Sequence, residues 1–129
     1  MRALFPTLAQ SLLVLRGYVA LLFLAHAVVR LANGSVPQFG AFLESRGFPY
    51  GTWVVMLISA GEIAGALMLA FGWRVRCACA YLAFIVAMGI VLIHAGRGWF
   101  VGEHGAGGME YSWLILAALL VTASADRRA

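Results

Sequence analysis

Residues 52–71 read TWVVMLISAGEIAGALMLAF, a stretch of twenty positions in which Glu62 is the only ionisable residue. An α-helix rises about 1.5 Å per residue, so this stretch matches the roughly 30 Å apolar thickness of a bilayer. Apolar segments of similar character cover residues 8–31, 77–94 and 109–123. The sequence therefore predicts an all-α integral membrane protein, a four-helix bundle that forms a single domain over residues 1–129.

The composition supports a membrane location. Hydrophobic residues make up 64% of the 129 positions and charged residues only 11%, whereas soluble domains contain about 45–50% and about 25%. A water-soluble fold of this size has too much surface to hide so much apolar area. The nine basic residues are all arginines and are scattered rather than clustered. We therefore expect the lipid bilayer as a partner and no nucleic acid.

A short amphipathic segment, Pro37–Arg46, separates the first and second apolar stretches. Its apolar side chains recur at helical spacing, and Pro37 suits a helix start. We expect this helix to lie on the membrane surface with Glu44 and Arg46 toward water. The segment 95–108 is rich in glycine, which predicts a flexible or turn-rich loop.

The distribution of arginines predicts an orientation. One side of the predicted bundle collects five of them: Arg2, Arg74, Arg76, Arg127 and Arg128. The other side collects three: Arg30, Arg46 and Arg97. Because basic residues accumulate on the cytoplasmic side, we expect both termini there and the two longer loops outside.

Ionisable side chains inside a bilayer are costly and usually face the bundle interior or a wet cavity. Glu62 falls near the middle of its segment, and His26 falls about 8 Å outward of the midplane. Arg30 follows His26 by one helical turn on the same face. His94 and Glu110 lie near the outer ends of the third and fourth segments. All five map to the outer half of the membrane and predict one polar pocket.

Two interpretations of this pocket are open. It can bind a polar head group such as a quinone carbonyl, with histidine as hydrogen-bond donor and glutamate as proton acceptor. It can equally be a polar lock that holds the helices in register. Glu110 opens the fourth segment and also fits a capping or helix-dipole role.

Other residues carry weaker signals. His26, His94 and His104 have the chemistry of metal ligands but not the spacing of a metal motif, so no metal site is predicted. Cys77 and Cys79 point to nearly opposite faces of a helix, which predicts small apolar fillers rather than a disulfide. The motif Gly61-x-x-x-Gly65 predicts a close helix contact.

The order and spacing of several short motifs resemble the DoxX family of small four-span membrane proteins, over nearly the whole chain. Ala27 and Ala64 stand where that family usually has glycine. The matching pieces are Leu15-Arg16-Gly17, Phe23 to Ala27 with Arg30, Phe39 to Pro49, Gly61 to Leu67 with Gly72 and Arg76, His94, Gly98-Trp99-Phe100, and Gly108 to Tyr111.

The resemblance implies a multi-pass protein of the bacterial inner membrane, with one DoxX-like domain. It implies a subunit of a redox system that interacts with quinone or with a partner oxidoreductase. The alternatives are a non-catalytic assembly subunit of a larger membrane complex and a small solute or lipid carrier. No intrinsic cofactor and no catalysis by the chain alone are expected. The candidate pocket residues are His26, Arg30, Glu62, His94, Glu110 and Tyr111.

Overall fold

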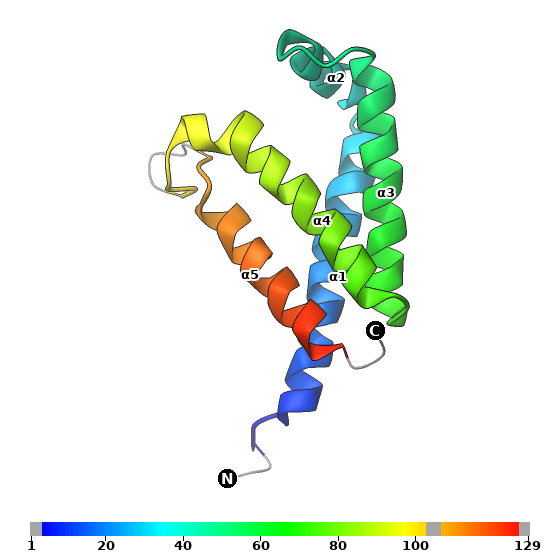
Figure 1. Cartoon of the computed structure of the whole chain (residues 1–129), viewed down its shortest axis with the longest axis vertical. Coiled ribbons are helices and arrows are strands. Elements are labelled where there is room, and N and C mark those ends of the chain that lie inside the picture. Colours follow the sequence, from blue (N-terminus) through cyan, green and yellow to red (C-terminus); the bar gives the residue numbers. More distant parts are fainter. Residues whose placement is uncertain (1–3, 103–106, 127–129) are drawn as a thin grey trace.

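The computed structural model describes residues 4–102 and 107–126, and it is all-helical (Figure 1). The helix that begins at Val75 continues beyond Gly89 through a π-helical turn, Ile90–His94, and a 3-10 turn, Ala95–Arg97. The described residues contain no strand, so the predicted all-α class is confirmed. The five helices are α1 (Leu8–Ala32), α2 (Val36–Ser45), α3 (Gly51–Phe71), α4 (Val75–Gly89) and α5 (Glu110–Ala125).

Three of these helices are long and apolar enough to cross a membrane: α1, α3 and the continuous helix Val75–Arg97. Helix α5 is apolar but has only 16 residues. Its length of about 24 Å falls short of a hydrocarbon core of about 30 Å. Crossing by the fourth segment therefore stays a prediction. Large apolar side chains stand exposed on these helices, such as Leu57 at 75% and Leu120 at 68%, and lipid would cover them.

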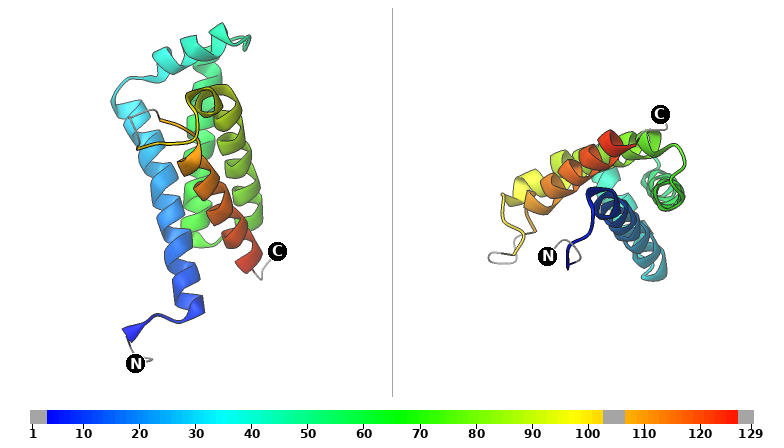
Figure 2. Two further views of the ribbon diagram at one scale, coloured as in Figure 1. Left: turned by 90° about the vertical axis from the view of Figure 1, so that its left-hand side faces the viewer. Right: turned by 90° about the horizontal axis from the view of Figure 1, so that it is seen from below.

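Helix α1 packs on α3, and α4 packs on α5. The two pairs meet at the end opposite α2 and diverge toward α2 (Figures 1 and 2). The main apolar core fills the end where they meet. Its buried residues are Val19, Ala20, Phe23, Ala66, Leu69, Val75, Ala78, Cys79, Leu82 and Leu119.

Small residues explain the contact between α3 and α4. Gly61 lies against the side chain of Tyr81, and a Cβ atom at Gly65 would lie 3.2 Å from Leu82 Cδ2. The close helix contact predicted from the glycine spacing is therefore present. Cys79 is buried and Cys77 is exposed, so the two free thiols diverge as expected.

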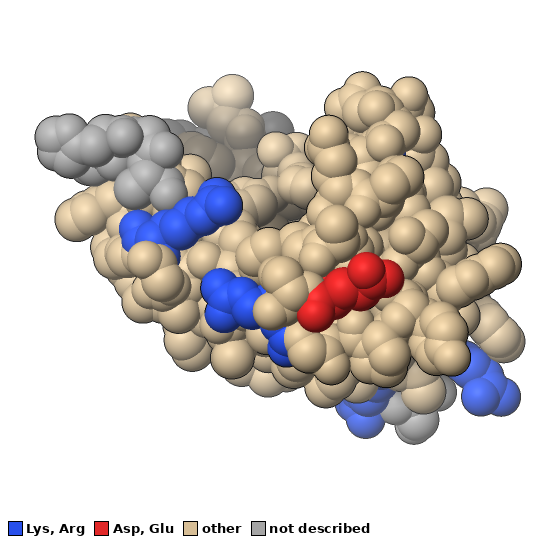
Figure 3. Space-filling view, turned by 90° about the horizontal axis from the view of Figure 1, so that it is seen from above, with Lys and Arg blue, Asp and Glu red and all other residues tan. Residues whose placement is uncertain are grey.

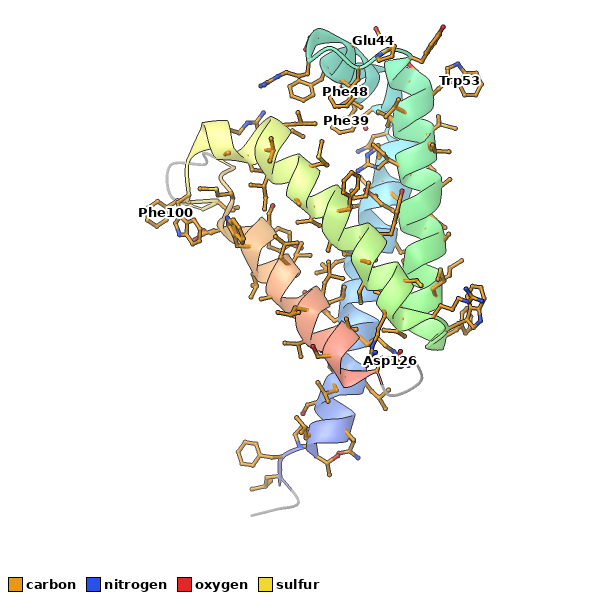
Figure 4. All side chains as sticks on the ribbon, in the orientation of Figure 1. Phe39, Glu44, Phe48, Trp53, Phe100 and Asp126 are labelled. Atoms are coloured by element: carbon orange, nitrogen blue, oxygen red, sulfur yellow. The ribbon has the colours of Figure 1, made fainter. Side chains whose placement is uncertain are left out.

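Helix α2 lies across the diverging end and is anchored to the start of α3. The backbones of Gly40 and Gly51 touch, with Thr52 N only 2.6 Å from the place of a Cβ atom at Gly40. Glu44 Oε1 accepts a hydrogen bond of 3.0 Å from the Gly51 N–H. Figure 4 shows Phe39 on the side of α2 that faces the rest of the molecule. The amphipathic helix predicted over Pro37–Arg46 is thus present as α2, and it covers the diverging end of the molecule. Glu44 bonds to the first residue of α3 while remaining exposed.

Arg76, in the first turn of α4, caps the end of α5. Its Nε–H donates to the Ala123 carbonyl at 3.2 Å, and its Nη2 donates to the Asp126 carbonyl at 2.8 Å. The Ala123 carbonyl also accepts from the Asp126 N–H at 3.2 Å, and the Asp126 carbonyl lies just past the end of α5. A cation at a helix C-terminus also favours the helix dipole. The two bonds therefore join the start of α4 to the end of α5.

Replacing Arg76 with methionine is expected to lower the free energy of unfolding by about 1 kcal/mol, because two hydrogen bonds at an exposed helix end are lost. Unfolding by sodium dodecyl sulfate in mixed micelles would measure the change. Arg74→Met removes the same charge from a side chain that stacks on Trp73, and it is expected to cost less. Equal losses in the two variants would show that charge alone matters here.

Candidate functional site

A cavity of about 340 Å³ lies at the α2 end, among all five helices. Its wall is mainly apolar, with Leu22 from α1, Leu43 from α2 and Val86 from α4 among its members. Seen from above, the surface at this end is hollowed (Figure 3). The size is at the lower end of the range for small-molecule sites. Six polar residues contribute to the wall: His26, Arg30, Glu62, His94, Tyr111 and Ser112.

An ion pair joins α1 to α3 inside this wall. Arg30 Nη1 lies 3.3 Å from Glu62 Oε2, and it also donates to Ser59 Oγ at 2.9 Å. The side chain of Glu62 is 5% exposed and that of Arg30 is 19% exposed. The guanidinium also lies over the ring of Phe39, 5.5 Å from its centre. Burial of the carboxylate is tolerable because the cation and its hydrogen bond compensate for lost solvation.

His26 lies one helical turn before Arg30 on α1, and its side chain is exposed. Its Nδ1 lies 2.8 Å from the Leu22 carbonyl oxygen. A carbonyl can only accept, so Nδ1 carries the proton and donates. In the neutral imidazole the Nε2 atom then holds a lone pair and acts as an acceptor.

His94 ends the π-helical turn that follows α4, and it is half-buried. Its Nδ1 donates to the Gly107 carbonyl at 2.9 Å, which ties the end of this helix to the residues before α5. Turns of this type occur frequently at functional sites, where they redirect one side chain. As in His26, the bond fixes the tautomer and leaves Nε2 as the acceptor.

The two neighbouring residues at the start of α5 have different environments. Tyr111 lines the cavity and is 37% exposed. Glu110 does not line it: its Oε1 accepts from the Val101 N–H at 2.9 Å, and its own N–H donates to Trp99 O at 2.9 Å. Glu110 therefore braces the loop before α5 and stands in the first turn of that helix, which fits the helix-dipole interpretation; its carboxylate does not cap α5, because it accepts from the Val101 N–H.

The structure thus brings together five of the six candidate residues around one cavity and leaves Glu110 outside it. Sequence reasoning missed Ser59, Ser112 and Phe39 as contributors. The spacing of Ser59, three residues before Glu62, was the available signal, because residues three apart share a helix face.

A metal centre has no support in the described part of the chain. Residues 4–102 and 107–126 hold no group of three histidine, cysteine, aspartate or glutamate side chains placed to share an ion. His104, considered from the sequence as a ligand, lies outside the described residues. The absence of a metal stays a prediction.

A comparison with known families places these observations in context. The sequence profile of the DoxX family matches residues 11–95. The chain belongs to the DoxX family. The resemblance inferred from the short motifs is thereby confirmed. No curated protein and no solved structure matches the chain.

The DoxX match runs from the first third of α1 to just past the π-helical turn, and so it contains four of the six polar residues that line the cavity. These are His26, Arg30, Glu62 and His94. Tyr111 lies beyond the matched region, as does the whole of α5. DoxX membership and the long apolar helices together show a membrane protein.

Proposed function

We propose that this DoxX protein is a membrane subunit of a redox system and that its cavity holds the head group of a quinone-type ligand. One observation supports the proposal most: an ion pair and two histidines share a mainly apolar cavity. An apolar wall suits an aromatic ring and the start of its lipid tail, while few polar groups suffice to orient the ring. The chain would then bind the carrier, and a partner oxidoreductase would exchange electrons with it.

The proposal includes a setting. We place the protein in the bacterial inner membrane, with α1, α3, the α4 helix and α5 crossing it and both termini in the cytoplasm. Arg74 and Arg76 lie at the end opposite α2, and Arg30, Arg46 and Arg97 lie toward the α2 end, so the five keep the grouping that the sequence predicts. The excess of arginines that sets the orientation comes from the remaining members of the first group. Arg2, Arg127 and Arg128 lie outside the described residues. The cavity then opens in the outer half of the bilayer.

A second candidate, a non-catalytic assembly subunit, draws support from the same ion pair. Arg30, Glu62 and Ser59 satisfy one another, as a polar lock between α1 and α3 requires. A carrier has less support. A second cavity, of about 640 Å³, lies at the other end of the molecule, and it shares no lining residue with the first. The apolar core lies between the two.

Purification in mild detergent, followed by mass spectrometry of bound lipids and proteins, tests the proposal. We expect quinone to co-purify with the wild type and to fall about tenfold in Glu62→Gln. The amide can still accept from Arg30, so the fold is retained, but it cannot take a proton. Asp126→Asn makes the same chemical change outside the cavity and should retain the quinone.

A stable protein partner without any quinone, in all three proteins, would contradict the ligand site and support the assembly subunit. Equal quinone in Glu62→Gln and the wild type would show that the carboxylate does not contact the ligand.

A further inference from the structure

We infer that the cavity selects the reduced, dihydroxy form of a quinone over the oxidised, dicarbonyl form. This inference rests on the proposed function and specifies the chemistry of the ligand. It comes from the hydrogen bonds already made by the polar residues of the wall, because these determine which donors and acceptors are left for a ligand.

The two histidines offer acceptors rather than donors. Each uses its Nδ1–H on a main-chain carbonyl, Leu22 for His26 and Gly107 for His94. Neither Nε2 atom has a hydrogen-bond partner within residues 4–102 and 107–126. A neutral imidazole held in this way accepts one hydrogen bond at Nε2. The histidines therefore fit a ligand that donates, in contrast to the donor role predicted from the sequence.

The remaining polar residues do not reverse this preference. Arg30 Nη1 is engaged with Glu62 and Ser59, and the rest of its guanidinium can donate to any ligand oxygen. Tyr111 and Ser112 have hydroxyls that donate or accept. A carbonyl oxygen accepts from Arg30 and leaves both imidazole lone pairs unmatched. A phenolic hydroxyl accepts from Arg30 and also donates to a histidine.

The energetic consequence follows from the asymmetry of hydrogen bonds. His26 is exposed and His94 half-buried in the free protein, so their Nε2 atoms meet water until a ligand covers them. A covered acceptor that loses water without gaining a donor costs more than a made bond contributes. Two hydroxyls can meet two imidazoles, whereas two carbonyls meet neither. We expect a difference of about tenfold in the dissociation constant, the size that one or two neutral hydrogen bonds produce.

The test compares the binding of decylubiquinol and decylubiquinone to the purified protein in lipid nanodiscs at pH 8. The wild type should bind the quinol about tenfold more tightly. The double variant His26→Phe/His94→Phe should bind the two forms within about twofold of each other. His26→Gln, whose amide supplies an N–H donor, should shift the preference toward the quinone.

The outcomes separate this inference from the proposed function. Equal or tighter binding of the quinone by the wild type would overturn the inference and leave the quinone site standing. Binding of neither form would overturn both. A preference for the quinol that survives in the double phenylalanine variant would show that the histidines do not cause it, and would overturn the inference as well.

Discussion

Replacing Arg30 with methionine is expected to lower the free energy of unfolding by about 3 kcal/mol. The change leaves the carboxylate of Glu62, 5% exposed, without its cation and without the hydrogen bond at 3.3 Å. Breaking one partner of a buried pair is costly because the other charge stays desolvated. Ser59 also loses the donor that lies 2.9 Å from its hydroxyl. Unfolding by sodium dodecyl sulfate in mixed micelles would measure the loss.

A double-mutant cycle supplies the control. Glu62→Leu alone should also destabilise, but by less, because Arg30 is 19% exposed and can extend toward water. The combined variant Arg30→Met/Glu62→Leu should lie within about 1 kcal/mol of the wild type, since apolar replacements of a buried pair are often neutral. If the two single losses simply add, within about 0.5 kcal/mol, the pair is not coupled.

The double variant also distinguishes the two functions of the ion pair. If the ion pair only locks α1 to α3, the apolar pair replaces it, because the free energy of unfolding is restored. If the ion pair also binds a ligand, the apolar pair does not replace it, because the charged and hydrogen-bonding groups are gone. If the proposed function holds, Arg30→Met/Glu62→Leu should therefore be stable and yet retain no quinone. A stable variant that keeps the ligand would assign the pair a structural role only.

Much of the fold was predictable because the length of an apolar segment and the position of a helix-ending glycine are local features of the sequence. The helices expected over residues 8–31 and 52–71 are Leu8–Ala32 and Gly51–Phe71. Left-handed backbone at Gly47 and Gly72 ends α2 and α3, as their positions in the sequence indicate. The pairing of Arg30 with Glu62 follows from similar depth in adjacent helices.

The remaining features depend on tertiary contacts that leave no local pattern. Ile90–His94 reads as an ordinary apolar helix, yet it forms a π-helical turn, and the His94 side chain at its end bonds to Gly107 before α5. Glu110 was expected in the pocket from its depth alone, but a nearby loop N–H captures its carboxylate. The two carbonyls that the histidine Nδ1 atoms reach, Leu22 O and Gly107 O, depend on the folded backbone, and the sequence alone does not show them.

Helix α2 forms one wall of the cavity, and its contact with α3 leads to the second large prediction. Gly51→Ala is expected to lower the free energy of unfolding by about 3 kcal/mol. A Cβ atom at Gly51 would overlap the carbonyl of Gly40 and approach Glu44 Cγ to 2.9 Å. Backbone atoms of a helix cannot shift as a flexible side chain does, so α2 must move off α3. Loss of the Glu44 hydrogen bond to the Gly51 N–H would follow. Unfolding in mixed micelles and proteolysis of the connection 46–50 would both report the change.

Gly17→Ala is the matched control, because nothing lies within 4 Å of a Cβ atom at Gly17 in the middle of α1. Alanine favours a helix over glycine by about 1 kcal/mol, so this variant should be as stable as the wild type or more so. Since Phe39 and Leu43 of α2 line the cavity, Gly51→Ala should also weaken quinol binding, and Gly17→Ala should not. If the two alanine variants unfold alike and resist protease alike, the contact between Gly40 and Gly51 does not hold α2 in place on α3.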